Sequence, residues 1–320
     1  MRTITLFVLS LSSILLLALP NRASNESATS LTQARQGFHT NLLPSPKRER
    51  EAIEQPPPEL LQKVKYACAV GELGALVSPQ TKDGKRHPAL IWIHGGPCNE
   101  VSVGLCLEDA PKENDQSGGI FRKMGIITMY PSLRGGNDNP GAQEGFLGEV
   151  DDVLAAASYL SKRADVDPNR IYIGGHSTGG TLALLTAECA PEKFRGELRA
   201  VFCFGPVFDV SDYDRNLIPF APGNPKEVRL RSPGYWLASI KCPTFVFEGA
   251  VSPSNVGDLE SMRKSTTNPF LHFYAVPNAS HFSILAPTTK LIAGKILADD
   301  TGDATTINFT DAELSAPFLH

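Results

Sequence analysis

Residues 174–180 read Gly-Gly-His-Ser-Thr-Gly-Gly; they follow the apolar run 170–173 and precede the helix-like run 181–185. A strand, a G-x-S-x-G turn and a helix in this order predict a nucleophile elbow, with Ser177 in a strained turn. The glycines are needed because a side chain two positions from the serine would collide with the neighbouring strand or helix. The start of the helix also places free N–H groups beneath the serine, where an oxyanion would form.

On both sides of this turn, short apolar strands alternate with helices. Strands are predicted at 63–68, 74–78, 89–93, 125–130, 171–173, 200–204, 244–247 and 271–276, and helices at 149–161, 181–189, 258–264 and 288–297. Continuous apolar strands separated by helices predict an α/β fold, with a mostly parallel central sheet and helices on both faces. Such sheets carry their sites at the carboxyl ends of the strands.

The N-terminus has the pattern of an export signal. Arg2 supplies a positive charge, residues 4–19 form an apolar run, and Ala23 offers a small residue for cleavage. A signal peptide over 1–23 predicts a secreted or periplasmic protein. Because Asn21 occupies a position where cleavage prefers a small residue, an uncleaved membrane anchor stays open as the alternative.

The rest of the chain divides by composition into an arm, a domain and a tail. Residues 24–59 are polar and rich in proline, which predicts a tether or a poorly ordered arm. Residues 60–298 carry the alternating strands and helices of one domain. Within it, residues 211–239 contain no clear strand, so we expect a helical excursion that forms a lid or a pocket wall. Residues 299–320 predict a loosely held polar tail.

Composition narrows the classes of partner. The chain has 320 residues, 42% of them hydrophobic and 20% charged, with a net charge of −4, which is ordinary for a globular protein and offers no basic surface for nucleic acid. Its six cysteines show no metal-binding spacing, so no metal is expected, and the acyl-transfer chemistry described below needs no organic cofactor. Export would permit disulfides, and Cys98 and Cys106, which flank one loop, are the best candidate pair. These features leave the oligomeric state open.

Other predicted strands also end in residues that acyl transfer could use. The strand at 89–93 runs into His94-Gly-Gly-Pro97, where paired glycines let backbone N–H groups approach a developing negative charge. His281 follows the last strand, 104 residues after Ser177, which suits a general base arriving from the far side of the sheet. Arg134, after another strand, is either a structural ion-pair residue or a pocket charge, and we favour the structural role.

In combination these motifs resemble the α/β-hydrolase domain of the prolyl oligopeptidase family, over about residues 60 to 298. The matching motifs are the HGGP turn at 94–97, the RGG loop at 134–136, the D-P-x-R-I run at 167–171 before the Ser177 elbow, and residues 205–209, 232–233 and 242–244. The resemblance implies Ser177 as nucleophile, His281 as base, and an oxyanion site at Thr178, His94 and Gly95. The β-propeller that screens peptides in that family has no room in residues 24–59.

The acidic residue that the family carries is missing from its usual position in this sequence. The family usually has an aspartate three residues after the glycine that ends the next-to-last strand, and here that position is Ser252. A serine cannot offset the charge of the imidazolium that forms during attack. Asp209, Glu248 and Asp258 are possible substitutes, and a Ser-His dyad or an inactive site are the remaining alternatives.

Two functions follow from these features. The first is a serine hydrolase that cleaves a peptide, amide or ester bond through an acyl-enzyme intermediate, acting on a small molecule or a short peptide. The second is a non-catalytic binding protein with the same fold, which the serine at position 252 motivates. The sequence leaves the substrate open.

Overall fold

The computed structural model describes residues 29–44, 50–108, 110–194, 198–299, 302 and 304–319. The predicted signal peptide, residues 1–23, lies outside the described residues. Within the described ranges, no helix is both long and apolar enough to span a bilayer.

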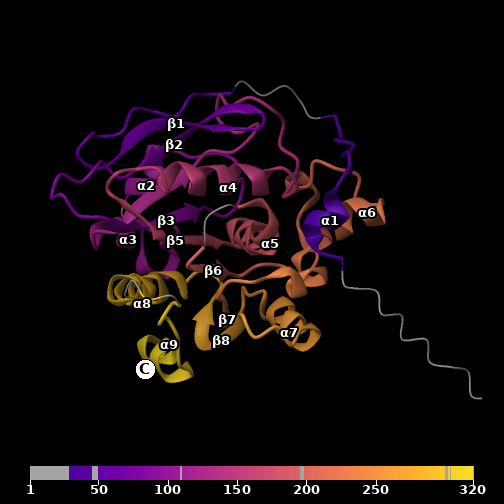
Figure 1. The fold of residues 1–320 in the computed structure, drawn as a ribbon. Coiled ribbons are helices and arrows are strands. Elements are labelled where there is room, and N and C mark those ends of the chain that lie inside the picture. The colour runs from indigo at the N-terminus through magenta and orange to yellow at the C-terminus, as the bar shows by residue number, and fades with distance from the viewer. Residues whose placement is uncertain are drawn as a thin grey trace, which may run out of the picture.

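An eight-stranded sheet forms the centre of the molecule, in the order β1-β2-β4-β3-β5-β6-β7-β8 (Figure 1). Strand β2 pairs antiparallel with both β1 and β4, and the other neighbours pair in parallel. The strands are β1 Gln62–Cys68, β2 Gly71–Val77, β3 His87–Ile93, β4 Ile127–Pro131, β5 Val166–His176, β6 Ala200–Phe204, β7 Thr244–Val251 and β8 Leu271–Ser280. The predicted α/β class with a mostly parallel sheet is therefore confirmed.

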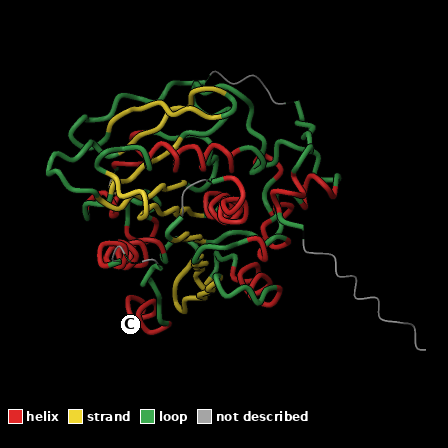
Figure 2. The backbone as a smooth tube through the Cα atoms, in the orientation of Figure 1, coloured by secondary structure: helices red, strands yellow, loops and turns green. Residues whose placement is uncertain are grey.

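Helices cover both faces of this sheet (Figure 2). Alternate side chains of β3 show why: Ile91 and Ile93 join an apolar cluster with α4, α5 and α7, whereas Trp92 joins a second cluster with α3 and α8. The helices are α1 Leu31–Arg35, α2 Val103–Leu107, α3 Gly119–Lys123, α4 Glu149–Leu160, α5 Thr178–Lys193, α6 Pro225–Arg229, α7 Val256–Ser265, α8 Leu285–Ala298 and α9 Asp311–Ser315. The short 3-10 helices are η1 Lys112–Asn114, η2 Val210–Asp212, η3 Arg215–Leu217, η4 Pro233–Tyr235, η5 Leu237–Ser239 and η6 Ala316–Phe318.

The segment 211–239 is a helical excursion between β6 and β7. Most of η2, all of η3, η4 and η5, and α6 lie within it, and none of its residues, all of which the structure describes, belongs to a strand. It is not a loose loop, because Phe220 is fully buried and Leu237 is nearly so. The excursion therefore packs as part of the domain.

The described part of the arm packs against α5 and this excursion, and α1 and α6 lie in the same part of Figure 1; the Leu31 N–H donates to Ser239 Oγ over 3.2 Å. Leu31 is fully buried. The Arg35 guanidinium donates to the carbonyl oxygens of Phe146 (2.9 Å), Leu147 (3.0 Å) and Leu230 (2.8 and 3.0 Å). Composition predicts a tether here, whereas these residues make buried contacts with the domain. The reason is that an arginine can satisfy several backbone acceptors at once.

The described part of the tail is also packed. Asp299 is buried and accepts from Arg199 Nε (2.9 Å) and the Tyr172 hydroxyl (2.7 Å). Phe309 lies with its ring edge against the rings of Phe245 and Phe247, with both centroid separations 5.1 Å. The polar composition of residues 299–320 predicts a loose tail, because composition alone does not show that a few side chains anchor the segment.

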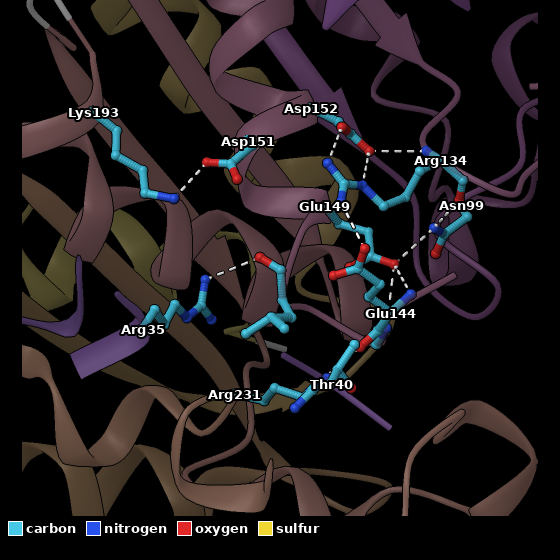
Figure 3. A network of polar contacts seen from close by, with 12 residues as sticks. Arg35, Thr40, Asn99, Arg134, Glu144, Glu149, Asp151, Asp152, Lys193 and Arg231 are labelled. Carbon is cyan, nitrogen blue, oxygen red and sulfur yellow. Dashed lines mark hydrogen bonds and ion pairs between the residues drawn. The ribbon is translucent and has the colours of Figure 1, made fainter. Parts of the chain in front are cut away.

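Arg134 lies in a buried polar network (Figure 3). Its Nη2 is 2.8 Å from Asp152 Oδ1 and its Nη1 is 2.8 Å from Glu144 Oε1. Glu149, the first residue of α4, accepts from the Glu144 N–H (2.6 Å) and from Asn99 Nδ2 (3.1 Å). Arg134 thus joins the loop after β4 to α4, which is the structural role favoured from the sequence.

Glu188 on α5 is a buried carboxyl group whose two oxygens find no hydrogen-bond partner among the described residues. Burial raises the pKa of Glu188, although the nearby charge of Arg35 opposes this. A carboxyl whose pKa is higher in the folded than in the unfolded chain binds more protons when folded. Its contribution to the free energy of unfolding therefore decreases as pH rises above about 4.3, the ordinary glutamate pKa.

We expect Glu188→Gln to reduce this pH dependence, because the neutral amide cannot ionise. Between about pH 5 and about pH 8, the urea midpoint of the variant should fall less than that of the wild type. Urea unfolding followed by circular dichroism measures both slopes. Equal slopes would mean that Glu188 titrates normally.

Candidate active site

Ser177 occupies the strained turn that the sequence predicts. It has φ 56° and ψ −116°, lies between β5 and α5, and its N–H donates to the Phe204 carbonyl over 2.8 Å. A Cβ at Gly175 would lie 2.3 Å from the Gly179 carbonyl oxygen, and one at Gly179 would lie 2.2 Å from the Ile93 oxygen. The flanking glycines are therefore required by close backbone contacts, and the turn presents a serine at the carboxyl end of β5.

His281 lies in the loop between β8 and α8 and faces a carboxylate. Its Nδ1 is 2.9 Å from Glu248 Oε2, and the Glu248 side chain is fully buried near the end of β7. The other oxygen, Oε1, accepts from the Gly249 N–H over 2.8 Å. With Nδ1–H donated to the carboxylate, Nε2 of a neutral imidazole is left as an acceptor, which is the tautomer that a general base needs.

The other two acids proposed from the sequence have different partners. Asp209 is bonded to the Ser211 N–H (2.9 Å) and to the Tyr235 hydroxyl (2.8 Å). Asp258 Oδ1 accepts from the Phe208 N–H over 2.8 Å. Asp209 therefore holds its own turn, Asp258 joins α7 to the segment after β6, and Glu248 is the acid of the three that meets the imidazole.

Gly205, at the end of β6, lies directly against the acid–imidazole pair. A Cβ on it would lie 2.3 Å from His281 Cε1 and 2.5 Å from Glu248 Oε2, and its φ of +57° favours glycine as well. Its carbonyl accepts from Asn255 Nδ2 over 2.9 Å, which fixes the turn. The glycine of the 205–209 motif therefore makes room for the contact between His281 and Glu248.

Backbone N–H groups without a hydrogen-bond partner among the described residues lie in the two segments next to the serine. A Cβ on Gly95 would lie 3.2 Å from Ser177 Cβ, so the loop after β3 approaches Ser177 closely. The Thr178 hydroxyl donates to the Gly96 carbonyl over 2.7 Å and ties this loop to the start of α5. The N–H groups of Gly95, Gly96 and Thr178 donate to no atom in the described parts of the chain. They are therefore available to an oxyanion.

The His94 side chain is directed into the core. It stacks on Tyr130 with ring centroids 5.6 Å apart, and its Nε2 is 3.7 Å from Cys106 Sγ. Burial lowers the pKa of His94 to about 4. Any part that His94 takes in an oxyanion site would therefore come from its backbone. The disulfide considered for Cys98 and Cys106 is not formed, since both are free thiols and Cys106 faces His94 instead.

His176 is a residue of the site to which the sequence analysis assigned no role. Its Nε2 is 3.1 Å from the His281 carbonyl oxygen, and the two imidazole rings are 4.5 Å apart between centroids. Nothing in the local sequence signals this contact, because it joins residues 105 positions apart. No group of three or more His, Cys, Asp or Glu residues that could hold a metal ion occurs among the described residues.

The fold and this site define a class of protein, the serine hydrolases with an α/β-hydrolase fold. The sequence model of the prolyl oligopeptidase family matches residues 116–284, which is more than half of the chain. The protein belongs to the prolyl oligopeptidase family and is a serine hydrolase.

The individual relatives that match share less than 30% sequence identity with this chain. The chain is 28% identical over 141 residues to the uncharacterized peptidase YtmA of Bacillus subtilis, covering 40% of this chain and 53% of that protein. It is 26% identical over 128 residues to a poly(3-hydroxybutyrate) depolymerase of Ralstonia pickettii, covering 37% of this chain and 25% of the depolymerase. The matches thus span about half or less of these relatives.

Solved structures share the fold. The dipeptidyl peptidase 4 of Porphyromonas gingivalis superposes with a TM-score of 0.57 at 18% identity, over 74% of this chain and 35% of that one. The hyperthermophilic esterase of the archaeon Pyrobaculum calidifontis superposes with a TM-score of 0.52 at 18% identity, over 76% of this chain and 84% of the esterase. At this identity the likeness concerns the fold alone.

Proposed function

We propose that Ser177, His281 and Glu248 form a catalytic triad that hydrolyses a peptide, amide or ester bond through an acyl-enzyme. The observation that carries this proposal is the buried 2.9 Å contact between His281 Nδ1 and Glu248 Oε2. This contact supplies the negative charge that the serine at position 252 cannot supply. It therefore favours the enzyme over the non-catalytic binding protein that Ser252 motivated.

The reaction would proceed in two halves. Ser177 Oγ attacks the carbonyl carbon while His281 Nε2 takes its proton, and Glu248 stabilises the imidazolium. The N–H of Thr178, with those of the loop at Gly95, holds the oxyanion; one such donor is worth about 3 kcal/mol in the transition state. The imidazolium then protonates the leaving group, and water repeats the sequence to release the acid.

We further propose a small ester, a small amide or a short peptide as the substrate. This chain covers 84% of the length of the Pyrobaculum esterase but 35% of that of the Porphyromonas peptidase. The excursion at 211–239 packs as part of the hydrolase domain, and we propose that it contributes to selection of the substrate. Export by the signal at residues 1–23, with retention as an anchor as the alternative, remains a proposal from the sequence.

A fluorophosphonate probe tests the proposed nucleophile. We expect the purified protein lacking residues 1–23 to be phosphonylated, and the modified peptide identified by mass spectrometry to contain Ser177. The Ser177→Ala variant is the control and should remain unlabelled. Hydrolysis of p-nitrophenyl acetate and of an aminoacyl-anilide panel would separate esterase from peptidase activity. Absence of labelling, or labelling that survives Ser177→Ala, would refute the proposal.

A further inference from the structure

His176 is the last residue of β5 and directly precedes the proposed nucleophile. Its side chain is almost completely buried, with 1% of the residue exposed. Its ring lies 4.5 Å from that of His281 between centroids, at an angle of 45°, and edge-on to the ring of Phe282 at 5.6 Å. The residue before the nucleophile is therefore in van der Waals contact with the proposed base.

Hydrogen bonds define the proton positions on this ring. A carbonyl oxygen can only accept, so His176 Nε2 carries the proton that is donated to the His281 carbonyl over 3.1 Å. Burial, together with the neighbouring His281, lowers the pKa of His176 to about 3, so the ring is neutral at ordinary pH. Nδ1 is then an acceptor. The atom 3.1 Å from it is Oε1 of Gln116, so the Gln116 amide has to be exchanged end for end to present its NH2 group to Nδ1, and the Asn114 amide that now accepts from Gln116 Nε2 has to be exchanged with it.

Gln116 is itself anchored to the core. Its backbone oxygen accepts from the indole N–H of Trp92 over 2.9 Å, and the Trp92 side chain is fully buried beneath the sheet. A continuous series of contacts thus runs from the core through Gln116 and His176 to the backbone of His281. The series ends on a loop residue, which has no strand or helix of its own to hold it.

The other contacts of His281 hold its ring and its N–H group, and His176 holds its carbonyl group. Glu248 fixes the ring through Nδ1, and the Pro253 carbonyl accepts the His281 N–H over 2.8 Å. The carbonyl of His281 is held by His176. With that bond the peptide group on each side of the base is fixed, one to the loop after β7 and the other to the end of β5.

We propose that His176 is a positioning residue that fixes the separation between Ser177 Oγ and His281 Nε2. It does so because its main chain adjoins the nucleophile while its side chain holds the backbone of the base. The inference rests on the proposed Ser177–His281–Glu248 triad. A displacement of about 1 Å at reacting groups can cost about 100-fold in rate, so such a connection bears directly on turnover.

Two amide substitutions test the two ring nitrogens of His176 separately. In His176→Gln the amide nitrogen reaches about as far as Nε2 and can still donate to the His281 carbonyl. In His176→Asn the shorter amide stays near the position of Nδ1, beside Gln116, and loses the bond to His281. We expect His176→Asn to lower kcat about 30- to 100-fold with KM changed less than about threefold, and His176→Gln to stay within about fivefold of the wild type.

Two further measurements separate positioning from a general loss of structure. The downfield proton resonance of His281 Nδ1 should persist in both variants, because the bond to Glu248 is untouched. Amide hydrogen exchange at residues 281–284 should be faster in His176→Asn and unchanged in His176→Gln. If the asparagine variant does not fold, His176→Phe keeps the ring volume and loses the donor, and it should behave as expected for asparagine.

The outcomes distinguish this inference from the proposed function. Equal kcat values and equal exchange rates in the asparagine and glutamine variants would overturn the role of His176 while leaving the triad intact. Loss of the downfield proton in His176→Asn would also overturn it, since the residue would then act on the Glu248 bond. If the wild type fails to label at Ser177, the proposed function fails, and the exchange comparison still decides whether His176 holds the loop.

Discussion

Replacing Glu248 with glutamine is expected to lower kcat about 10⁴-fold, the loss seen when a triad carboxylate becomes an amide. The side-chain volume stays the same, but the amide cannot offset the positive charge that His281 acquires when Ser177 attacks. It can also turn its NH2 group toward Nδ1 and favour the wrong tautomer of the imidazole. Steady-state kinetics on whichever reporter substrate the wild type hydrolyses, and the rate of inactivation by a fluorophosphonate, measure the effect.

Matched controls come from the two acids that have other partners. Asp209→Asn and Asp258→Asn remove charge near the same strand ends, but these carboxylates are bonded to backbone N–H groups and, for Asp209, to the Tyr235 hydroxyl. We expect both to keep kcat within about threefold of the wild type. If Glu248→Gln retains most of its turnover while either control loses it, the acid has been assigned to the wrong residue.

The largest expected effect on stability is at Asp152. Its carboxylate is completely buried and accepts from the backbone N–H (2.9 Å), Nε (2.9 Å) and Nη2 (2.8 Å) of Arg134. Asp152→Asn would leave a buried guanidinium that keeps the ion pair with Glu144 and loses the one with Asp152. Removing one member of a buried ion pair costs about 3–5 kcal/mol. For a domain of this size that corresponds to a fall of about 10 °C in Tm.

The neighbouring residue provides the control for this prediction. Asp151 lies on the same helix and pairs with Lys193 at 2.6 Å, with both side chains partly exposed (Figure 3). A surface pair of this kind contributes at most about 1 kcal/mol. Thermal unfolding of Asp152→Asn and Asp151→Asn, followed by circular dichroism, should therefore differ clearly. Similar Tm values for the two variants would mean that the buried network adds little to stability.

Much of the fold could be predicted from the sequence because buried parallel strands are continuous apolar runs. The strand predicted at 200–204 coincides with β6, and the helix predicted at 149–161 differs from α4 by one residue. The strand predicted at 171–173 was too short, since β5 begins at Val166 and includes the polar run 167–170. Pairing with β3, which joins Val166 to His87, extends the strand where its own composition would end it.

The proposed nucleophile and the proposed base are carried by local motifs, but the residues that would support them are not. The acid stayed open among three residues because its identity depends on how closely the ends of β7 and β8 approach, and on the longer side chain of Glu248. His176 was assigned no role because its partner is distant in sequence. Both contacts are made only when loops from different strands meet, and no local pattern encodes them.

The arm shows a different limit of prediction from composition. A polar, proline-rich segment has few apolar groups to bury, so it is expected to remain loose. Here one arginine compensates for that missing apolar area by binding three backbone carbonyls, and Leu31 is fully buried in the core. Whether an arginine can anchor a segment in this way depends on where the backbone carbonyl groups lie in the folded protein, and composition does not contain that information.

This arrangement sets a boundary for maturation of the N-terminus. If the chain is trimmed by a protease, the cut has to fall upstream of Ser30, whose side chain caps α1. A recombinant version begun at residue 60 would be deprived of Arg35 and would leave the oxygens of Phe146, Leu147 and Leu230 without their donor. The catalytic unit of this protein therefore starts some thirty residues earlier than its hydrolase motifs suggest.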